Sequence, residues 1–548
     1  MVLGRDVLLE VLRTEGVQHL FGNPGSTELP LIDALAGVDD LHYVLALQEA
    51  TAVGMADGYA QATGRPAFLN LHTSAGLGNA IGNLTNARAN GTPLVVTAGQ
   101  QDERHLADDP LLSGDLVGLA GPVSKWAHEV RSPDELGTIL RRAFRDAAAP
   151  PTGPVFVSIR MDHLDRETAA AVPPRSTVDH RTVPPDLGTL ASFLTGPEPG
   201  KLAIVAGDEV AHSGGVPALV ELAGALGAPV FGSPLYGSVV FPTTSPLWRG
   251  MLPPQASAIR STLEGFERVL LVGGSAFLVY PWSEGSPLPG ALELAHLSPD
   301  AAQPGRAHPV ALGAVGDPAA TLTALLPEVR PRAHGAAAGS VADARDRRRE
   351  EDAAREDTAH SRYGPAPMHP MAAAHALMRA IPDGTAVVDE AITTGVYVRG
   401  FHQAEQPGRY LFCRGGGLGW GMPAALGVSL GNDREPVVCV VGDGSAMYSP
   451  QALWTAARER LPVIFAVVDN GQYLILKNNL RASGGTSART GRFVAMDLDD
   501  PPIDFLALAQ SMGVPATRVE STHDIPAAVR FALAAGGPHL LHIPIAAR

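Results

Sequence analysis

The feature that most constrains this chain is a repeated alternation of short apolar strands with helical stretches. HYVLAL precedes ATAVGMADGYAQAT, PAFLNL precedes GLGNAIGNLTNARA, and PLVVTA precedes a loop. Strands that alternate with helices predict parallel sheets with helices on both faces. The alternation resumes at KLAIVAGDEV and again after residue 363. We therefore expect an α/β fold of three doubly wound parallel-sheet domains.

Two changes of composition divide the 548 residues. A Pro-rich stretch lies around residues 173–200, and residues 331–362 are Ala-rich, carry mixed charge and lack an apolar stripe. Such a segment indicates an exposed helix or a mobile connection. The predicted parts are a domain over 1–180, a central domain over 190–330, a charged linker over 331–362 and a domain over 363–548.

Charge and cysteine content exclude several classes of protein. Lys and Arg total 41 against 56 Asp and Glu, a net charge of −15 without a basic cluster, so no nucleic-acid partner is expected. Cys413 and Cys439 are too few for a disulfide framework or a Cys-based zinc site, which favours a reducing cytoplasm. MVLGRDVLLEVLRTEG has the spacing of an amphipathic helix, and no apolar run approaches the roughly 18 to 20 residues that span a bilayer. No membrane partner is expected.

Two glycine-containing turns carry the strongest chemical signal. PVVCVV ends at Gly442-Asp443-Gly444, a helical stretch follows, and PVIFAVV ends at Asp469-Asn470-Gly471. In a right-handed βαβ unit both strand ends emerge at the same edge of the sheet. Asp443 and Asn470 should therefore be neighbours, although 25 residues separate Gly444 from Asn470.

Oxygen donors that converge at a helix start suit Mg²⁺ and a phosphate group. A hard cation takes oxygen ligands and keeps phosphate oxygens in its shell, while backbone N–H groups at the helix start face the same anion. Either turn alone is as easily a simple Gly turn. Their combination, with a helix and a strand between them, favours a magnesium diphosphate site.

GDG followed after about 25 residues by Asn-Gly at a strand end resembles the thiamin diphosphate motif of the family that includes pyruvate decarboxylase, acetolactate synthase and benzoylformate decarboxylase. FGNPGSTELPLIDAL, VLALQEATAVGMADGYAQATGRPAFLNLHTSAGLGNAIGNL, PLVVTAGQQ, GGGLGWGMPAALG and GDGSAMYSPQALWTAA look most like the benzoylformate decarboxylase branch. The first and third blocks are covered densely, and the middle block only loosely.

The resemblance implies a site for thiamin diphosphate and Mg²⁺. It implies metal ligands at Asp443, Asn470 and Gln472. The implied cofactor-binding residues are Glu49, Asn23, Pro24, Gly25, Thr393, Gly417, Leu418, Gly442, Asp443, Gly444, Ser445, Asn470 and Tyr473. The implied catalytic residues are Glu49, His72 and Ser26.

Glu49 and His72 also have simpler interpretations. Glu49 follows HYVLALQ in a stretch without another charge until Asp57, and it matches the glutamate that activates the cofactor's pyrimidine ring; it could equally be a first-turn carboxylate favoured by the helix dipole. His72 follows PAFLNL at the sheet edge where ligands collect, and its pKa range suits proton transfer. A lone His there is more often structural, but LHTSAGLGNA matches the family.

Three further positions are less decided. Ser26 matches the residue that contacts the substrate carboxylate, and an N-cap role before TELPLIDAL, with Glu28 in the first turn, is equally reasonable. Leu418 matches the apolar residue that props the cofactor in a bent shape, although burial alone would explain it. GLGNAIG lacks the GxGxxG spacing, so we interpret it as backbone clearance near the cofactor and Asn79 as a loop or helix-start residue.

One departure from the family concerns proton transfer. The resembled decarboxylase has a second active-site histidine where GGSAFLVYPW places Pro281, and a proline carries no titratable proton. Aldehyde release is then expected to be slow and carbon–carbon ligation favoured. Leu111, Leu112, Tyr280 and Ile475 suggest an apolar substrate pocket, narrowed by Ile475.

The leading interpretation is a non-oxidative, thiamin diphosphate-dependent decarboxylase of a benzoylformate-like 2-oxo acid. The first alternative is an acetolactate-synthase-like carboligase. A flavin- or nucleotide-dependent oxidoreductase is less favoured, because KLAIVAGDEV and VLLVGGSAF lack a dinucleotide fingerprint, and so is a non-catalytic relative. The resemblance further implies a homodimer or homotetramer whose active sites are shared between subunits.

Overall fold

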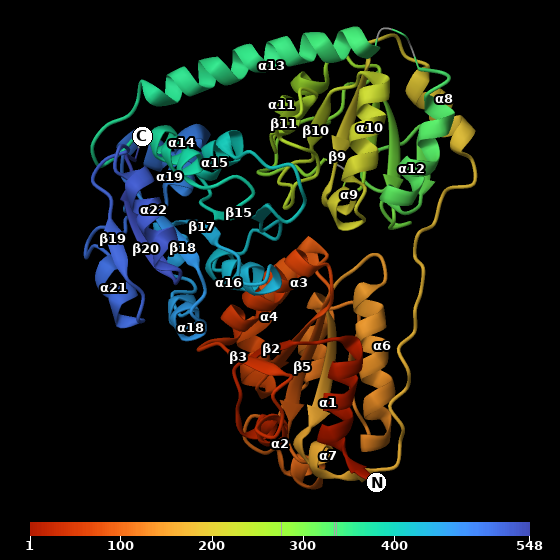
Figure 1. The fold of residues 1–548 in the computed structure, drawn as a ribbon, viewed down its shortest axis with the longest axis vertical. Coiled ribbons are helices and arrows are strands. Elements are labelled where there is room, and N and C mark those ends of the chain that lie inside the picture. The colour runs from red at the N-terminus through yellow and green to blue at the C-terminus, as the bar shows by residue number, and fades with distance from the viewer. Residues whose placement is uncertain (276, 334, 336, 548) are drawn as a thin grey trace.

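The computed structural model describes residues 1–275, 277–333, 335 and 337–547. Three six-stranded sheets, in which every strand pairs in parallel with its neighbours, account for most of the strands. Helices flank each sheet, and the three domains lie around a central junction (Figure 1). The predicted α/β fold of three doubly wound domains is confirmed.

The first sheet runs in the order β3-β2-β4-β5-β7-β6. Its strands are β2 (His19–Gly22), β3 (His42–Leu45), β4 (Ala67–Leu71), β5 (Leu94–Gln100), β6 (Ala127–Glu129) and β7 (Val155–Arg160). The surrounding helices are α1 (Gly4–Glu15), α2 (Leu29–Leu35), α3 (Glu49–Thr63), α4 (Thr73–Asn90), α5 (Leu116–Ala120), α6 (Leu136–Ala148) and α7 (Met161–Asp165). Two short strands, β1 (Val2–Leu3) and β8 (Glu167–Thr168), pair antiparallel beside them.

The middle sheet has the order β11-β10-β9-β12-β13-β14. It consists of β9 (Leu202–Ala206), β10 (Val230–Gly232), β11 (Trp248–Met251), β12 (Arg268–Val272), β13 (Glu293–Ser298) and β14 (Leu312–Val315). Its helices are α8 (Leu187–Thr195), α9 (Asp208–His212), α10 (Val216–Leu226), α11 (Ala256–Leu263) and α12 (Pro318–Val329). This is the strand order of dinucleotide-binding folds, with the reversal between β9 and β12.

The third sheet has the order β16-β15-β17-β18-β20-β19. Its strands are β15 (Ala386–Glu390), β16 (Tyr410–Phe412), β17 (Val437–Gly442), β18 (Val463–Asp469), β19 (Ala516–Arg518) and β20 (His539–Pro544). Its helices are α14 (Pro370–Ala380), α15 (Gly395–Phe401), α16 (Gly421–Gly431), α17 (Asp443–Ala446), α18 (Ala452–Glu459), α19 (Leu474–Ser483), α20 (Thr486–Thr490), α21 (Phe505–Ser511) and α22 (Ile525–Ala535). Counted along each sheet, the first and third domains share one strand order.

The predicted linker forms helix α13 (Ala337–His360), which spans from the middle to the third domain (Figure 1). Only Ala344 and Ala359 are buried among its described residues, which agrees with a segment without an apolar stripe. Arg348 fastens the helix to the middle domain by donating to the carbonyls of Trp248 and Thr243 at 3.1 and 3.0 Å. The linker is therefore an exposed helix; residues 334 and 336 lie outside the described residues.

Helices α3 and α16 join the first and third domains into one packed body (Figure 1). Their apolar residues belong to one hydrophobic cluster, which includes Met55 from α3 and Leu426 from α16. A methyl group added at Gly427 would overlap the carbonyl oxygen of Met55, and one at Gly58 would overlap that of Ala424. Glycine is required at both places because the two backbones touch.

The amino-terminal residues form the predicted amphipathic helix, α1, whose buried side includes Val7, Leu8 and Leu12. Among the helices that the structure describes, none is both long enough and apolar enough to cross a membrane.

Candidate active site

Asp443 forms the centre of a polar corner in the third domain. It begins α17 directly after β17, and its side chain is buried, with 4% exposed. Its Oδ2 accepts hydrogen bonds from the backbone N–H groups of Asn470 and Gln472, both at 3.2 Å. Because β17 and β18 pair in parallel, their ends bring these residues together as the sequence predicts.

The charge at this corner suits the binding of a cation. Burial raises the pKa of Asp443 to about 6, and the nearby Asp469 carboxylate adds to the effect, while the N–H groups of Gly444 and Asn470 oppose it. Asp469 is itself held by His542, whose Nε2 lies 2.8 Å from Oδ2. Two neighbouring carboxylates with amide oxygens beside them form the donor set that a hard divalent ion prefers.

A hollow at the same corner is lined entirely by third-domain residues. Gly444 lies against the ring of Tyr473, where an added methyl carbon would be 2.5 Å from Cε1. Nine of the predicted residues line the hollow, namely Thr393, Leu418, Gly442, Asp443, Gly444, Ser445, Asn470, Gln472 and Tyr473. Ile475 lines it as well. Gly417 lies next to Leu418 but does not line the hollow.

Glu49 belongs to a second polar cluster, in the first domain. It is the first residue of α3, where Gln48 is the N-cap, and 8% of it is exposed. Asn79 donates from Nδ2 to Glu49 Oε2 at 3.0 Å. Gly76 packs on the same carboxylate, since an added Cβ there would lie 3.0 Å from Oε1. Glu49 is thus a buried carboxylate in the first turn of a helix, which fits both the cofactor-activating and the helix-dipole interpretation.

Asn79 and the glycines near it correct one prediction. All of Gly76–Gly82 lies inside α4, so Asn79 is neither a loop residue nor at the helix start. Only Gly76 provides clearance of the expected kind; added methyl groups at Gly78 and Gly82 would meet no atom within 4 Å. The Gly-rich composition suggested a loop, but the packing of α4 on its neighbours outweighs the low helix propensity of glycine.

His72 is paired with a buried glutamate that the sequence did not single out for catalysis. Its Nδ1 lies 2.8 Å from Glu28 Oε2, and Glu28 is 2% exposed. The same carboxylate accepts from the N–H groups of Gly25 and Gly99 at 3.0 and 2.9 Å. The Glu28 hydrogen bond raises the pKa of His72, against the opposing effect of burial. The carboxylate fixes the tautomer and leaves Nε2 for other partners.

The NPGST loop lies directly beside His72. Gly25 packs on the imidazole ring so closely that an added methyl group would overlap it. Gly25, rather than Ser26, is the N-cap of the short 3₁₀ helix η1 (Ser26–Glu28), so the N-cap interpretation of Ser26 is wrong. The backbone N–H of Gly25 is already taken by Glu28. Ser26 and Pro24 are exposed, and Asn23 is half-buried.

The loop that carries Leu111 and Leu112 begins in a network of ion pairs. The side chains of Gln101 and Ser74 donate to the carbonyls of Leu111 and Leu112 at 2.9 and 3.2 Å. Just upstream, Glu103 lies close to Asp162 and His163, and these three side chains are of the types that can bind a metal ion.

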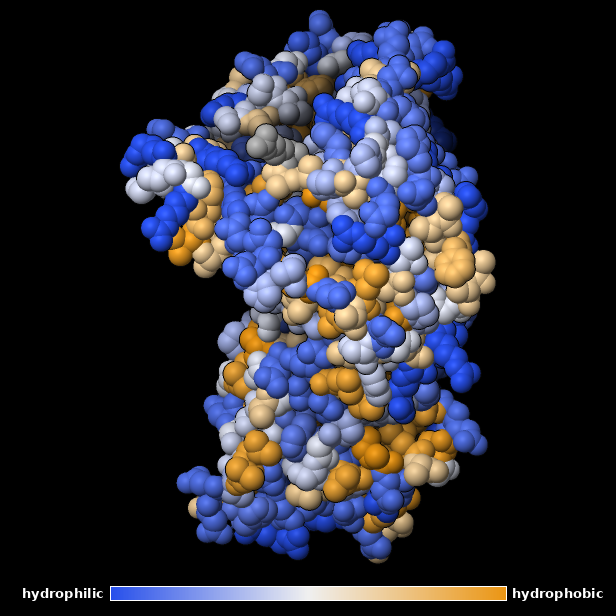
Figure 2. All heavy atoms as spheres, turned by 90° about the vertical axis from the view of Figure 1, so that its left-hand side faces the viewer, coloured by the Kyte–Doolittle hydropathy of each residue, from blue (hydrophilic) through white to orange (hydrophobic). Residues whose placement is uncertain are grey.

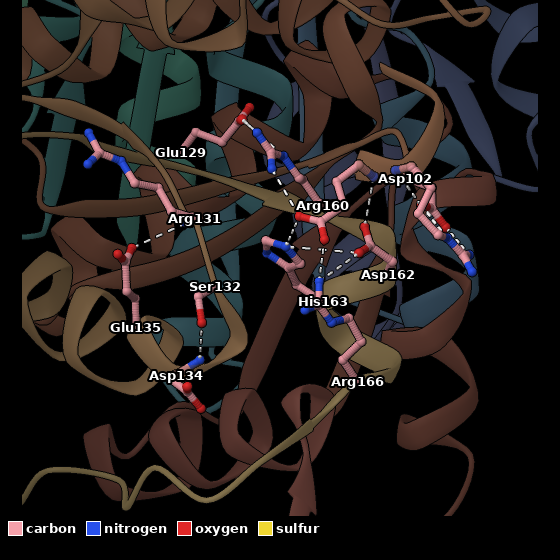
Figure 3. Close-up of polar contacts among 12 residues, drawn as sticks. Asp102, Glu129, Arg131, Ser132, Asp134, Glu135, Arg160, Asp162, His163 and Arg166 are labelled. Carbon is pink, nitrogen blue, oxygen red and sulfur yellow. Dashed lines mark hydrogen bonds and ion pairs between the residues drawn. The ribbon is translucent and has the colours of Figure 1, made fainter. Parts of the chain in front are cut away.

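Arginine side chains pair with the carboxylates of that network. Arg160 reaches Glu129 at 2.7 Å and Glu103 at 3.3 Å, and Arg166 pairs with Glu103 and with Asp162 at 3.4 Å (Figure 3). The cluster is therefore an ion-pair network that anchors the base of the loop at the carboxyl edge of β5 and β7.

The other predicted pocket residues lie apart within one chain. Ile475 lines the third-domain hollow, whereas Leu111, 83% exposed, belongs to the first domain. Tyr280, 62% exposed, and Pro281 belong to the middle domain. Within the described chain, no first-domain residue lines the hollow around Asp443.

Several residues of the site region escaped the sequence analysis, although α4 carried a usable signal. Asn79, Asn83, Asn86 and Asn90 are spaced by four, three and four residues, which places their amides on one helix face. Asp57 was also missed: it is fully buried and accepts from Trp420 Nε1 at 2.7 Å across the domain boundary. Glu390, also buried, accepts from the N–H groups of Gly419 and Gly421 at 2.7 and 2.8 Å.

Three parallel-sheet domains, with a carboxylate corner in the third and an acid–imidazole cluster in the first, define a class of three-domain α/β cofactor enzymes. Family models extend this assignment. Residues 3–118 match the N-terminal TPP binding domain of thiamine pyrophosphate enzymes, 198–325 the central domain and 393–543 the C-terminal TPP binding domain. The chain belongs to the thiamine pyrophosphate enzyme family.

Individual relatives agree with this family. Benzoylformate decarboxylase of Pseudomonas aeruginosa is 35% identical over 543 residues, 98% of this chain and 97% of that protein. The acetolactate synthase isozyme 3 large subunit of Escherichia coli is 27% identical, over 97% and 92% of the two chains. The solved structure of the Rhodococcus jostii thiamine diphosphate-dependent 4-hydroxybenzoylformate decarboxylase has a TM-score of 0.87 and 30% identity, covering 100% and 99%. The chain is a thiamin diphosphate-dependent enzyme of the carboxy-lyase and carboligase kind.

Proposed function

We propose that this enzyme decarboxylates a benzoylformate-like 2-oxo acid with thiamin diphosphate and Mg²⁺, and that it also joins the product to an aldehyde. The observation that carries the proposal is the corner in which buried Asp443 binds the backbones of Asn470 and Gln472. When bound, thiamin diphosphate supplies a nucleophilic carbon and an electron sink for loss of carbon dioxide. In this proposal Asp443, Asn470 and Gln472 hold Mg²⁺.

The remaining residues hold the two ends of the cofactor. Of the residues that line the hollow, Thr393, Gly442, Gly444 and Ser445 would hold the diphosphate, and Leu418 and Tyr473 would contact the rest of the cofactor. Gly417 would support Leu418, its neighbour in the chain. At the other end, Glu49 would hold the pyrimidine ring through a shared proton, and Asn23, Pro24 and Gly25 would form the surroundings of that ring. The apolar wall at Ile475 disfavours the charged substrate relative to its neutral product, which favours decarboxylation.

His72 and Ser26 act on the substrate. Glu28 holds the Nδ1 side of His72 at 2.8 Å, so Nε2 is the atom that delivers or receives a proton. Ser26 has an exposed hydroxyl one residue from Gly25, which packs on the His72 ring, and it contacts the substrate carboxylate in this proposal.

A homo-oligomer is part of the proposal, because the site is incomplete in one chain. Glu49 and His72 belong to the first domain, whereas the described residues that line the hollow around Asp443 all belong to the third domain. Large apolar side chains near both are exposed, among them Leu47, Leu111, Ile392 and Tyr448. Apolar patches also gather at mid-height and over the lower half of the face at the left of Figure 1 (Figure 2). Light scattering should detect a dimer or tetramer; a fully active monomer would contradict shared sites.

Pro281 supports ligation as a second activity. It is an exposed residue of the middle domain and has no proton to transfer, so the proton for aldehyde release would have to come from His72, water or the cofactor. Slower protonation leaves more time for an aldehyde acceptor to react. The acetolactate-synthase-like alternative rests on the same residue.

The nucleotide-dependent alternative is disfavoured by the middle domain. At the reversal between β9 and β12, Glu209 accepts a hydrogen bond from Gly274 N–H at 2.5 Å. A negative carboxylate at this turn repels the phosphates that a dinucleotide would place there. The buried free thiols of Cys413 and Cys439 support the proposed cytoplasmic location.

The test is a panel of aromatic, branched and linear 2-oxo acids with thiamin diphosphate and Mg²⁺, with and without an aldehyde acceptor. We expect carbon dioxide release to be fastest for aryl substrates and coupled hydroxyketones to accumulate with the acceptor. Turnover of pyruvate alone to acetolactate would favour the synthase-like alternative. Rapid and exclusive aldehyde formation would refute the role assigned to Pro281.

A further inference from the structure

One face of helix α4 carries three buried amide side chains, Asn83, Asn86 and Asn90, to which no role has been assigned above. Asn83, Asn86 and Asn90 are 4%, 1% and 5% exposed. A buried amide without partners is costly, so the partners reveal what each side chain stabilises. All three reach the segment from Arg414 to Gly419, more than 300 residues away in sequence.

Asn86 binds both backbone groups of one residue in that segment, Gly417. Its Oδ1 accepts from the N–H of Gly417 at 3.0 Å, and its Nδ2 donates to the C=O of Gly417 at 2.9 Å. The second Nδ2 hydrogen goes to Asn83 Oδ1 at 2.9 Å. Only one orientation of the amide satisfies these contacts, because the flipped amide would place NH₂ against the N–H of Gly417.

Asn83 and Asn90, on the same face of α4, bind other backbone groups of the segment. Asn83 donates to the C=O of Gly419 at 3.3 Å and to that of Ala50 at 2.7 Å. Asn90 accepts from the N–H of Arg414 at 3.0 Å. Gly417 has no room for a side chain, because an added Cβ would lie 2.8 Å from Asn86 Oδ1. The backbone is therefore fixed on both sides of Leu418, which lines the hollow.

We propose that Asn86 is a positioning residue for the cofactor: it holds the Gly417 peptide so that Leu418 keeps its place in the hollow. The inference rests on the proposed function. A purely structural amide would stabilise the contact between the first and third domains and nothing more. If the amide instead positions the cofactor, its removal changes how the cofactor is held even when the protein remains fully folded.

The experiment compares Asn86→Ala with a matched control, Thr97→Val. Thr97 is 1% exposed, and its hydroxyl donates to Leu69 O at 3.1 Å inside the first domain. The same hydroxyl accepts from Asn70 Nδ2 at 3.1 Å, so its replacement removes two buried hydrogen bonds away from the Gly417 segment. For each full-length protein, calorimetry measures thiamin diphosphate binding with Mg²⁺. NMR measures the rate at which the thiazolium C2 proton of the bound cofactor exchanges with deuterium.

We expect Asn86→Ala to slow the C2 exchange on the order of tenfold to a hundredfold, because small displacements have effects of this size. Thr97→Val should exchange at the wild-type rate despite lower stability. Exchange at the wild-type rate in folded Asn86→Ala would overturn the inference. Equal slowing in Thr97→Val would also overturn it. If the wild-type protein itself takes up no thiamin diphosphate, the proposed function fails instead.

Discussion

The first and third domains have the same strand order but different chemistry at the same edge. In both, the second strand of the sheet lies at one edge, followed by the first, third, fourth, sixth and fifth. The third strand of one sheet ends at His72 and that of the other at Asp443. The first edge holds an acid–imidazole pair, and the third holds carboxylates suited to an ion. The comparison teaches that strand order sets where a site forms, whereas a few residues set what it does.

The helices after the second strands make the comparison closer still. These helices, α3 and α16, pack against each other through Gly58 and Gly427. Each begins next to a group assigned to the cofactor: Glu49 starts α3, and Leu418 lies three residues before α16. The two domains therefore meet through their equivalent elements.

The largest expected effect comes from removing the carboxylic acid of the first domain. Glu49→Gln keeps the side-chain size but removes the acidic proton that we assign to contact with the pyrimidine ring. We expect kcat/KM to fall by about 10²- to 10⁴-fold, the usual range for a lost acid–base group. Steady-state kinetics at saturating cofactor measures the effect.

Glu10→Gln, an exposed change in α1, is the matched control and should leave activity unchanged. If Glu49→Gln retained wild-type turnover, the first domain would have no acid–base role.

The next largest effect comes from removing the buried carboxylate of the third domain. Asp443→Asn removes the charge that we assign to Mg²⁺ binding. We expect the Mg²⁺-dependent affinity for thiamin diphosphate to fall about a hundredfold, or about 2.7 kcal/mol. Calorimetric titration with and without Mg²⁺ measures it.

Asp383→Asn, an exposed change in the same domain, should bind normally. Cofactor binding by Asp443→Asn that matched wild type in its Mg²⁺ dependence would count against the ion site.

A third prediction tests the contact between the two domains. Gly427→Ala places a methyl group on the Met55 carbonyl, so we expect a loss of about 1 to 3 kcal/mol in the free energy of unfolding. Gly82→Ala in α4 meets no atom within 4 Å and should instead stabilise by about 0.5 to 1 kcal/mol. Urea unfolding compares the two, and opposite signs are the decisive result.

The smallest expected effect comes from changing the carboxylate that is paired with His72 in the first domain. Glu28→Gln removes the charge that raises the pKa of His72, so that pKa should fall. The limb of the kcat/KM profile that reports His72 should then move to lower pH, with a loss of about tenfold in activity. A profile with both limbs unmoved would show that His72 does not titrate in the measured step.

Local strand chemistry made much of this fold predictable. The runs PVVCVV and PVIFAVV formed β17 and β18, and the handedness of βαβ units placed Asp443 beside Asn470. Three middle-domain strands were not predicted. The sequence WRGM of β11 is not a β-branched run, and β13 contains His296, so their burial depends on neighbouring strands.

The site was less predictable where its contacts are long-range. The Glu28–His72 pair joins residues 44 apart through the first sheet, and Glu28 alone is typical of a first-turn carboxylate. The amides of α4 look like solvent-facing residues until Gly417 and Gly419 arrive from another domain. Periodicity indicates that these amides share a face, but only tertiary structure shows what covers it.

Helix α4 has an evolutionary consequence. Its amino-terminal end lies at His72, and its later turns grip the main chain around Leu418. A mutation that tilts or shifts α4 to suit a new substrate would therefore also move the main chain around Leu418, which we assign to the cofactor site. Adaptation of the two features is coupled, and variants with changed specificity should often need compensating substitutions along one helix.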